Sequence, residues 1–397
     1  MKIYKAAIIG LGPSGLAINK LIYQKKENEL IAFENTNIEK RNNFFGFWLT
    51  DWMQPFEELI EKKWNNWTIG DSKTQITLND QNYPYCVISF KTWKNYCLDT
   101  PNKLDIKNKK VINYHRVENY FKIITEDKKE YFAENIYDSR SKKEKNNELI
   151  QHFFGINIIT EEKKFDQNKL TLMRFTQEKD LLHFIYVLPF DQNKALVEST
   201  VFSKNILDEQ WYRERINNYL QLFNITKFKE NSTESGIIPM FFSDEKISND
   251  PNIFNIGIRG GACKPSTGYA FSFLIKQIQL LKNTNKNYVN VHHLIERKMD
   301  KIFINYLKNN NENGNSFIKL AKILNGNEFK NFMMGQSSVL TKLKIIRSMP
   351  KIPFIKLASN LNGNEFQSFM MGESNLLTKL KIINSMPKLP FIKELFK

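Results

Sequence analysis

The sequence of 397 residues contains only three cysteines, and this scarcity argues against two kinds of stabilised fold. Cys86, Cys97 and Cys263 form neither an even set for a disulfide framework nor the close pairs that are typical of zinc sites. We therefore predict no structural disulfide and no metal site. A reducing, cytoplasmic environment is the expected setting.

The sequence also lacks any run of about 18 apolar residues, so we expect no membrane-spanning helix. Its basic and then apolar beginning is superficially similar to a signal peptide, but the glycines at residues 10–15 interrupt the apolar stretch. The N-terminus is therefore interpreted as folded protein. The apolar fraction of 41% is sufficient for real cores, and the length favours two domains.

Acidic residues are scarce relative to basic ones, with 42 against 58, which gives a net charge of +16. Such an excess implies an anionic partner: nucleic acid, an anionic membrane surface or a phosphate-bearing cofactor. No nucleic-acid-binding motif accompanies the charge, so we do not expect nucleic acid as a partner.

The N-terminal residues predict a βαβ unit. Residues 3–9 and 30–34 are apolar runs typical of strands, and residues 16–23 have helical spacing. A Gly-Leu-Gly-Pro-Ser-Gly turn at residues 10–15 lies between the first strand and the helix, which is the context of the dinucleotide-binding fingerprint. An ordinary tight turn is the alternative interpretation.

Each residue of this turn has a physical role in dinucleotide binding. Gly10 permits the tight turn, Gly12 lets the backbone approach the pyrophosphate, and Gly15 allows the helix to pack closely on the strand. Pro13 and Ser14 begin the helix, whose N-terminus attracts phosphates.

Glu34 closes the second strand, where it would accept hydrogen bonds from the adenosine ribose hydroxyls. An acid at this position favours FAD or NAD over NADP, because it would repel the extra phosphate. The motif by itself does not separate FAD from NAD.

The middle of the chain has a different pattern. Residues 182–190 and 195–203 are β-rich and are separated by Asp-Gln-Asn-Lys, which predicts an antiparallel hairpin within a second sheet at about 150–245. A strand at 252–258, a glycine pair and a helix at 269–281 indicate that the cofactor-binding fold resumes there. Mainly helices are expected from residue 289 onward.

Several blocks in a fixed order resemble the lycopene cyclases, a family of carotenoid-ring-forming flavoproteins, over about residues 3–355. They are Asn-Asn-Phe-Phe-Gly-Phe-Trp at 42–48, Ile-Tyr-Asp-Ser-Arg at 136–140, Thr-Leu-Met at 171–173, Phe-Ile-Tyr-Val-Leu-Pro at 184–189, Leu-Val-Glu-Ser-Thr at 196–200, Gly-Ile-Ile-Pro at 236–239, Gly-Ile-Arg-Gly-Gly at 257–261 and Pro-Ser-Thr-Gly-Tyr at 265–269.

The resemblance implies a Rossmann-like FAD-binding domain of the glutathione reductase and p-hydroxybenzoate hydroxylase type, an antiparallel β substrate domain and a helical C-terminal region, in the α/β (α+β) class. The expected parts are a first FAD-binding part at 1–80, a substrate-domain segment at 81–100, a second FAD-binding part at 101–148, the substrate sheet at 149–245, a third FAD-binding part at 246–285, a helical region at 286–353 and a duplicated segment at 354–397.

The family's reaction, as the resemblance implies, is an isomerisation of lycopene through a monocyclic intermediate. A terminal double bond is protonated, a neighbouring double bond attacks the cation, and a proton leaves. FAD is needed in its reduced form, with NAD(P)H as the expected reductant. Glu198 corresponds to the first acid of the family's Phe-Leu-Glu-Glu-Thr motif and is the expected proton donor, whereas Ser199 replaces the second acid. In the loop that corresponds to the family's Asp-Ala-Arg-Gly, Ser141 stands where the family usually has glycine.

The other candidates for cofactor binding come from the same blocks. Arg259, Gly260 and Gly261 lie at a strand-to-helix turn where backbone amides could contact the flavin, and a plain turn is the alternative. Asp138 could bind a cofactor hydroxyl or cap a turn. Gly268 belongs to the Pro-Ser-Thr-Gly-Tyr block.

Four tryptophans suit a tunnel for a polyene, since aromatic faces bind flat apolar chains and stabilise cations, although core packing is an equal alternative. They are Trp48, Trp52, Trp64 and Trp67.

Residues 317–353 and 354–390 are identical at 28 of 37 positions, which indicates a tandem duplication. Apolar and basic residues alternate in both copies, so we expect peripheral association with an anionic membrane surface. In the first copy they are Leu340, Leu343, Ile345 and Ile346 with Lys342, Lys344 and Arg347, and Leu377, Leu380, Ile382 and Ile383 repeat the apolar set. Packing onto the protein body is the alternative for the first copy, and the second copy is expected to be dispensable for catalysis.

A flavin monooxygenase or reductase acting on another isoprenoid is the alternative function. It would couple steady NAD(P)H oxidation to its substrate, whereas a cyclase needs only a reduced flavin. The residues do not distinguish β from ε rings, or one ring from two.

Overall fold

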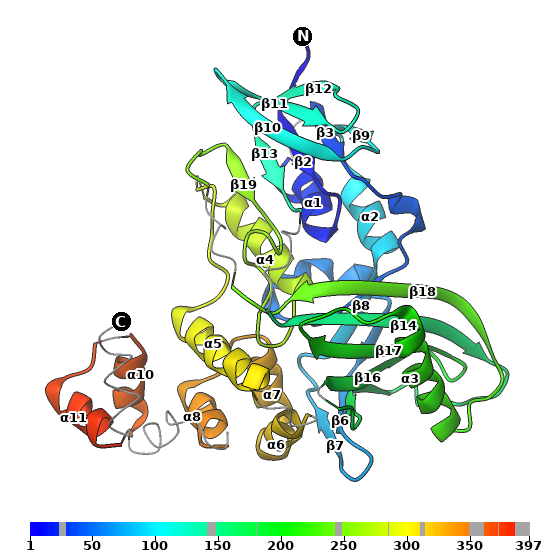
Figure 1. The fold of residues 1–397 in the computed structure, drawn as a ribbon, viewed down its shortest axis with the longest axis vertical. Coiled ribbons are helices and arrows are strands. Elements are labelled where there is room, and N and C mark those ends of the chain that lie inside the picture. Colours follow the sequence, from blue (N-terminus) through cyan, green and yellow to red (C-terminus); the bar gives the residue numbers. More distant parts are fainter. Residues whose placement is uncertain are drawn as a thin grey trace.

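The computed structural model describes residues 1–23, 29–140, 148–179, 181–242, 248–284, 286–309, 314–348, 361–371 and 373–385. Figure 1 shows an α/β unit at one end, a long antiparallel sheet at the other, and C-terminal helices beside the long sheet. The expected α/β (α+β) class is confirmed.

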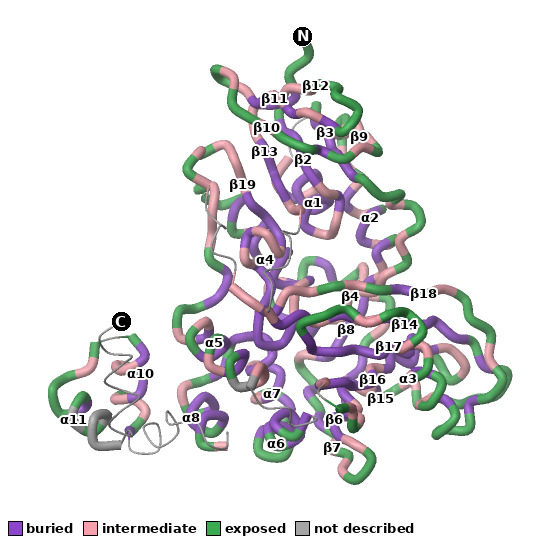
Figure 2. The backbone as a smooth tube through the Cα atoms, in the orientation of Figure 1, coloured by how far each residue is buried: buried purple, intermediate pink, exposed green. Residues whose placement is uncertain are grey.

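A five-stranded parallel sheet forms the first unit. Its order is β19-β13-β2-β3-β9, with bounds β2 Ala6–Ile9, β3 Glu29–Phe33, β9 Lys103–Lys107, β13 Ile136–Asp138 and β19 Ile253–Asn255. Alternation along β2 sends Ala6 and Ile8 toward the helices, and Ala7 and Ile9 toward a four-stranded sheet on the other face. Both faces of the central strands are therefore buried (Figure 2).

The helices on the first face are short and apolar. They are α1 Pro13–Ala17, which continues as a π-helix at Ile18–Ile22, together with α2 Phe90–Leu98 and α4 Phe271–Lys282. The four-stranded sheet has the order β1-β12-β11-β10, with bounds β1 Ile3–Tyr4, β10 Val111–Val117, β11 Tyr120–Thr125 and β12 Glu130–Ala133.

The single strand expected at residues 3–9 is divided between two sheets. Tyr4 pairs with Ala133 in the four-stranded sheet, whereas Ala7 pairs with Ile136 in the parallel sheet. The strand expected at 252–258 is also shorter, because β19 ends at Asn255 and a turn follows.

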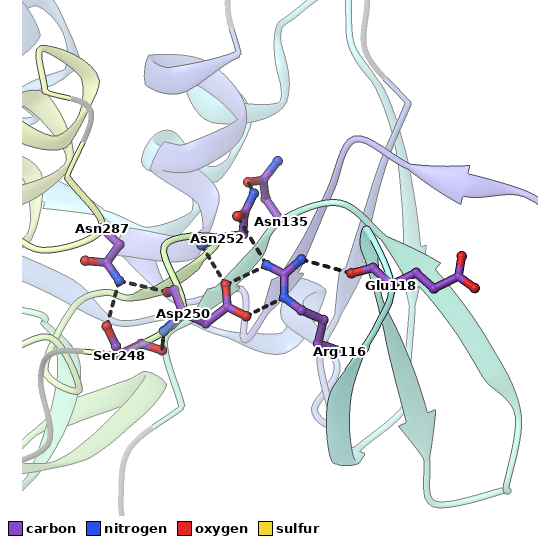
Figure 3. Close-up of polar contacts among 7 residues, drawn as sticks. All are labelled: Arg116, Glu118, Asn135, Ser248, Asp250, Asn252 and Asn287. Atoms are coloured by element: carbon purple, nitrogen blue, oxygen red, sulfur yellow. Dashed lines mark hydrogen bonds and ion pairs between the residues drawn. The ribbon is translucent and has the colours of Figure 1, made fainter.

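An arginine clamp joins the hairpin β10–β11 to the turn before β19 (Figure 3). The guanidinium of Arg116 donates to both carboxylate oxygens of Asp250, at 2.5 and 2.6 Å, and to the side-chain oxygen of Asn252 at 3.2 Å. Asn287 donates to the carbonyl oxygens of Ser248 and Asp250, at 2.9 Å each. The clamp fixes the start of β19 against the β10–β11 hairpin and so positions the segment that follows β19.

The second unit is a seven-stranded sheet of order β18-β14-β17-β16-β15-β6-β7. Its bounds are β6 Asn66–Gly70, β7 Gln75–Asn79, β14 Ile150–Thr160, β15 Lys169–Phe175, β16 Leu182–Pro189, β17 Lys194–Ser203 and β18 Phe228–Pro239. The predicted hairpin is confirmed, since β16 and β17 pair antiparallel from Leu182 with Phe202 to Pro189 with Ala195. Helix α3, Glu209–Leu222, covers one face.

Strands β6 and β7 lie in this second sheet, although the sequence analysis placed residues 66–79 with the first FAD-binding part. The reason is the parallel pairing of β6 with β15, a strand about a hundred residues later. A small sheet joins the two units, and its strands are β4 Phe44–Trp48, β5 Lys62–Trp64 and β8 Tyr85–Ser89. Two 3-10 helices, at Ile38–Lys40 and Asp51–Leu59, lie in the same part of the sequence.

The C-terminal region is helical, as expected. Its helices are α5 Leu294–Asn309, α6 Asn315–Ile323, α7 Gly326–Met333, α8 Val339–Ser348, α10 Gly363–Met371 and α11 Leu376–Ser385. The two copies repeat one local fold. In the first copy the side chains of Asn325 and Glu328 each accept the other residue's backbone N–H at the start of α7, and Lys344 donates to the Glu328 carboxylate. Asn362, Glu365 and Lys381 make the same contacts in the second copy.

The apolar side of the first copy is buried in the protein body. Leu343, Ile345 and Ile346 belong to the main core, and Lys342 forms an ion pair with Glu296 at 2.8 Å. The packing alternative therefore holds for α8, and only Leu340 of the predicted apolar set is exposed there, at 71%.

The second copy also packs, through Leu361, Phe366 and Met370, against a core that includes α5 and α8. Leu376 and Leu377 remain 76% and 72% exposed. The side chains of Leu380, Ile382 and Ile383 lie outside the described residues. No helix in the described part of the chain has the length and apolarity to cross a membrane.

Candidate active site

The glycine turn at residues 10–15 has the geometry that its sequence requires. Gly10 has a φ of +93°, where a side chain would be strained, and a Cβ on Gly15 would lie 2.0 Å from the carbonyl oxygen of Gly10. A Cβ on Gly12 would meet no atom within 4 Å. The turn is therefore tightly packed on its inner side and open at Gly12.

Glu34 is held beside this turn. Its carboxylate accepts the backbone N–H of Leu11 at 2.9 Å and the backbone N–H of Thr36 at 3.2 Å, and it forms an ion pair with Arg41 at 2.9 Å. Only 7% of the residue is exposed. The carboxylate is thus fixed at the end of β3, where the sequence analysis predicted a ribose acceptor.

A cavity of about 710 Å³ runs from this turn to the seven-stranded sheet. Its wall includes seven residues predicted as functional: Gly10, Gly12, Pro13, Ser14, Glu34, Glu198 and Gly268. The structure therefore brings the glycine turn and the predicted proton donor onto one continuous cavity, although they lie in different sheets.

Asp138 is not part of the cavity wall. It is fully buried, and its carboxylate accepts hydrogen bonds from Arg140, through Nε at 2.9 Å and Nη2 at 2.7 Å, and from the hydroxyl of Tyr114 at 3.3 Å. Arg259 approaches it to 3.6 Å. Both carboxylate oxygens are thus occupied by protein groups, and the neighbouring Ser139 and Arg140 line the cavity instead.

Arg259, Gly260 and Gly261 form a turn that packs inward. Arg259 Nε donates to Asn255 Oδ1 at 2.8 Å, and a Cβ on Gly260 would lie 2.2 Å from the Asn255 carbonyl oxygen. Gly261 has a φ of +74°. None of the three lines the cavity, so the plain-turn alternative describes their contacts.

Gly268 lies at the cavity with two unpaired polar atoms beside it. Its φ is +70°, and a Cβ there would collide with the side chain of Gln151. Gln151 Oε1 and Thr267 Oγ1 are buried without a hydrogen-bond partner, and both residues line the cavity. Buried polar atoms normally have partners, so a polar ligand at this part of the wall would satisfy these two atoms.

Glu198 lies on β17 and faces the cavity together with Leu196, as the period of two in a strand predicts. The residue is 7% exposed, and its Oε1 accepts a hydrogen bond from Thr200 Oγ1 at 2.5 Å. Burial raises the pKa of this carboxyl from 4.5 to about 7, because water no longer stabilises its charged form.

Glu234 is a second buried carboxyl on the cavity wall, and the sequence analysis missed it. It lies on β18, is 6% exposed, and accepts the backbone N–H of Phe44 at 2.9 Å. Burial and the nearby Glu198 raise its pKa well above 4.5. Residues 229–235 of its strand are all polar, so no alternation in the sequence marked Glu234 as buried.

The aromatic wall of the cavity differs from the one predicted. Trp48, Trp64 and Trp67 are fully buried in the core, and neither they nor Trp52 line the cavity. The tunnel interpretation is therefore wrong for the tryptophans. The aromatic residues that line the cavity are Phe33, Phe44, Phe45, Tyr85, Phe153, Phe184, Tyr186, Tyr269 and Phe271.

The tyrosines of this wall form a neutral group next to Glu198. The hydroxyls of Tyr85 and Tyr186 are 3.0 Å apart, and a Cβ on Gly46 would lie within 2.6 Å of both. Burial raises the pKa of Tyr85 to about 12, so the phenol is uncharged at neutral pH. Trp48 supports the group from behind, with its ring 5.1 Å from that of Tyr269.

Comparison with known proteins identifies the family. The sequence model of the lycopene cyclase protein family matches residues 6–359, which confirms the resemblance found in the sequence. No curated protein sequence matches the chain.

Solved structures share the fold at low sequence identity. A geranylgeranyl bacteriochlorophyll reductase-like protein from Thermoplasma acidophilum is 13% identical, with a TM-score of 0.58 over 89% of this chain and 98% of that one. HpxO from Klebsiella pneumoniae, complexed with FAD and uric acid, is 10% identical, with a TM-score of 0.57 over 84% and 96% of the two chains. The halogenase PltM is 9% identical, with a TM-score of 0.53 over 92% and 86%. The predicted Rossmann-like fold of the FAD-binding type is confirmed.

Proposed function

Because this chain belongs to the lycopene cyclase family, we propose that it closes β-ionone rings at the ends of lycopene, through a monocyclic intermediate, to give β-carotene. The observation that carries the proposal is Glu198, a carboxyl buried in a largely apolar cavity that also reaches the glycine turn.

The residues along the cavity fit FAD as the cofactor. The opening at Gly12 would admit the pyrophosphate, and Glu34 lies where the adenosine ribose would bind. The unpaired atoms of Gln151 and Thr267 beside Gly268 would contact the polar edge of the flavin. When bound in its reduced form, FAD would supply negative charge that stabilises a cation, and NAD(P)H is the proposed reductant. Asp138, Arg259, Gly260 and Gly261 would act indirectly, by holding the loops that carry these contacts.

Glu198 performs the protonation. A terminal double bond of a polyene is a weak base, so its protonation requires a carboxyl that keeps its proton near neutral pH and delivers it without water. Glu198 meets this requirement because its burial raises the pKa to about 7.

The aromatic wall receives the cation that protonation creates. The rings of Phe44, Phe184 and Tyr186 line the cavity near Glu198, and their faces attract positive charge. The neutral hydroxyls of Tyr85 and Tyr186 pair with each other. These phenols are therefore weak nucleophiles that would not trap the cation before the ring closes.

The substrate is dissolved in lipid, so the proposal includes peripheral contact of a cytoplasmic protein with an anionic membrane surface. The exposed leucines Leu340, Leu376 and Leu377, together with the basic residues of the C-terminal helices, support this contact.

The test uses purified protein with reduced FAD and lycopene in detergent, with the pigments separated by chromatography. The parent protein should produce β-carotene without consuming NAD(P)H in proportion to product. The Glu198→Gln variant should bind FAD and leave lycopene linear, with a rate about a hundred- to ten-thousand-fold lower. Parent protein that oxidises NAD(P)H in step with an oxygenated or hydrogenated product would instead support the alternative of a monooxygenase or reductase.

A further inference from the structure

Glu198 and Glu234 lie on either side of a single glycine. In the seven-stranded sheet, strand β14 separates β17 from β18, and Gly155 of β14 is in register with Glu198 on one side and Glu234 on the other. A Cβ on Gly155 would lie 3.4 Å from Glu198 Cβ and 3.3 Å from Glu234 Cγ. Both side chains therefore pass over the glycine, on the cavity face of the sheet.

The titratable groups next to these carboxyls are each other and two tyrosines. The neighbouring Tyr85 and Tyr186 are neutral phenols, and each carboxyl has one polar contact, from Thr200 Oγ1 and from the Phe44 N–H. Three of the four cations on the cavity wall pair with other carboxylates: Arg41 with Glu34, Lys109 with Asp127 and Arg140 with Asp138, and Lys110 is the fourth. Among the described residues, no ion pair joins a cation to Glu198 or Glu234.

We propose that Glu198 and Glu234 work as one carboxyl pair that holds a single catalytic proton, with Glu198 giving the proton that starts cyclisation and Glu234 taking up the proton that ends it. This inference rests on the proposed cyclase function. It assigns Glu234, a residue that no sequence motif indicated, as a second catalytic residue.

The proton balance of the reaction is satisfied by such a pair. The O–H bond of Glu198 breaks and a C–H bond forms from one π pair of the terminal double bond. A second π pair then closes the ring, and a C–H bond next to the new cation breaks to become the ring double bond. One proton enters the substrate and one leaves it at a different carbon. The ionised Glu234 receives the leaving proton, and transfer across Gly155 returns it to Glu198.

The energetics of two close carboxyls support the pair. Two buried carboxylates cannot both ionise near neutral pH, because each charge raises the pKa of the other. Burial raises the pKa of Glu198 to about 7, and burial together with the Glu198 charge raises the pKa of Glu234 well above 4.5. The pair therefore keeps one proton near neutral pH, and the proposed roles use the form in which Glu198 carries it.

The first experiment measures kcat against pH for FAD-loaded parent, Glu198→Gln, Glu234→Gln and the double variant. The parent should show a bell-shaped profile, because only the singly protonated pair is active. Glu234→Gln should lower kcat about a hundred- to ten-thousand-fold and lose the acidic limb. The double variant should be no slower than the slower single variant, since the two residues act as a unit. Glu230→Gln, an exposed position on the same strand, is the matched control and should keep the parent profile.

A Glu234→Gln variant with the parent rate and an intact bell would overturn the proposal. A variant with a changed KM but an unchanged kcat profile would do so as well, since it would indicate a structural role.

The second experiment does not depend on catalysis. Infrared spectra of the FAD-loaded parent, recorded across pH, should show two separated steps in the signal of buried protonated carboxyls. Either single substitution should remove one titration step. The remaining carboxyl should then titrate at a lower pH than the upper step of the parent. Gly155→Ala, which keeps both acids but places a methyl group between them, should bring the two steps closer together.

These measurements distinguish the carboxyl pair from the proposed cyclase function. A parent protein that shows the coupled titration but no cyclisation would defeat the proposed function and keep the pair. Two independent steps in the parent, unmoved by the substitutions, would defeat the pair even where cyclisation is observed.

Discussion

The carboxylate of Glu34 accepts the backbone N–H of Leu11 at 2.9 Å and so joins the end of β3 to the glycine turn. The same carboxylate pairs with Arg41, which also donates to the Leu11 carbonyl oxygen at 3.3 Å. Because Glu34 both supports the turn and lies at the proposed ribose position, its loss should affect cofactor binding before it affects the rest of the fold.

The Glu34→Gln variant should bind FAD about 10- to 150-fold more weakly, which corresponds to the loss of one hydrogen bond to a charged group, worth about 1.5–3 kcal/mol. Titration of the apoprotein with FAD, followed by flavin fluorescence, measures this change. Glu29→Gln, at the exposed start of the same strand, is the control and should bind like the parent. Equal affinity in both variants would place the cofactor elsewhere.

The buried carboxyls predict a stability that falls as pH rises. A carboxyl whose pKa is raised by folding contributes most below its unfolded value of 4.5, and the contribution is lost as pH rises toward the folded value, about 7 for Glu198. Between pH 5 and 8 the parent should therefore lose on the order of 3 kcal/mol of unfolding free energy relative to Glu198→Gln. Glu234→Gln should differ from the parent in the same direction.

Urea unfolding at several pH values provides the measurement, with Glu230→Gln as the exposed control. A difference between parent and Glu198→Gln that stays constant with pH would show that the carboxyl is solvated.

The second C-terminal copy should contribute stability without being required for cofactor binding. It buries Leu361, Phe366 and Met370 against the body, and Lys298 donates to the Met370 carbonyl oxygen at 2.6 Å, but none of its described residues lines the cavity. A chain ending after Lys356 should still bind FAD and cyclise lycopene in detergent, and its unfolding free energy should fall by about 3 kcal/mol, as for one lost core aromatic.

The equivalent substitutions Phe329→Ala and Phe366→Ala provide a matched pair for thermal unfolding and limited proteolysis. Phe366→Ala should expose only the second copy to cleavage, whereas Phe329→Ala should destabilise the whole protein. A truncated chain that loses its flavin would show that the second copy supports the active site.

Membrane contact should depend on the exposed leucines of the second copy rather than on the buried side of α8. Replacing both Leu376 and Leu377 by Glu should reduce flotation with anionic liposomes about tenfold for each leucine, since each side chain contributes about 1.5 kcal/mol or more when buried in the interface. Leu222→Glu on α3, also exposed, is the control. Parent protein that remains in the soluble fraction at low salt would defeat the membrane proposal.

The local features of this protein are readable from its amino-acid order. Gly10, Gly12 and Gly15 can be recognised because the turn requires residues without side chains at fixed spacing, and Glu34 follows from the length of one βαβ unit. The hairpin of β16 and β17 was predictable because its strands are consecutive and its four-residue turn is polar. Glu198 faces the cavity as its motif and the period of two predicted.

Which distant residues meet depends on how the strands and helices pack in three dimensions. Glu234 lies opposite Glu198 because β14 inserts between β17 and β18, and pairing between strands so far apart in sequence leaves no local pattern. The same long-range packing brought Tyr114 and Arg259 to Asp138 and buried Trp48 in the core. Periodicity shows which side of an element is apolar, but whether that side meets the protein core, a ligand or a membrane depends on the element packed against it.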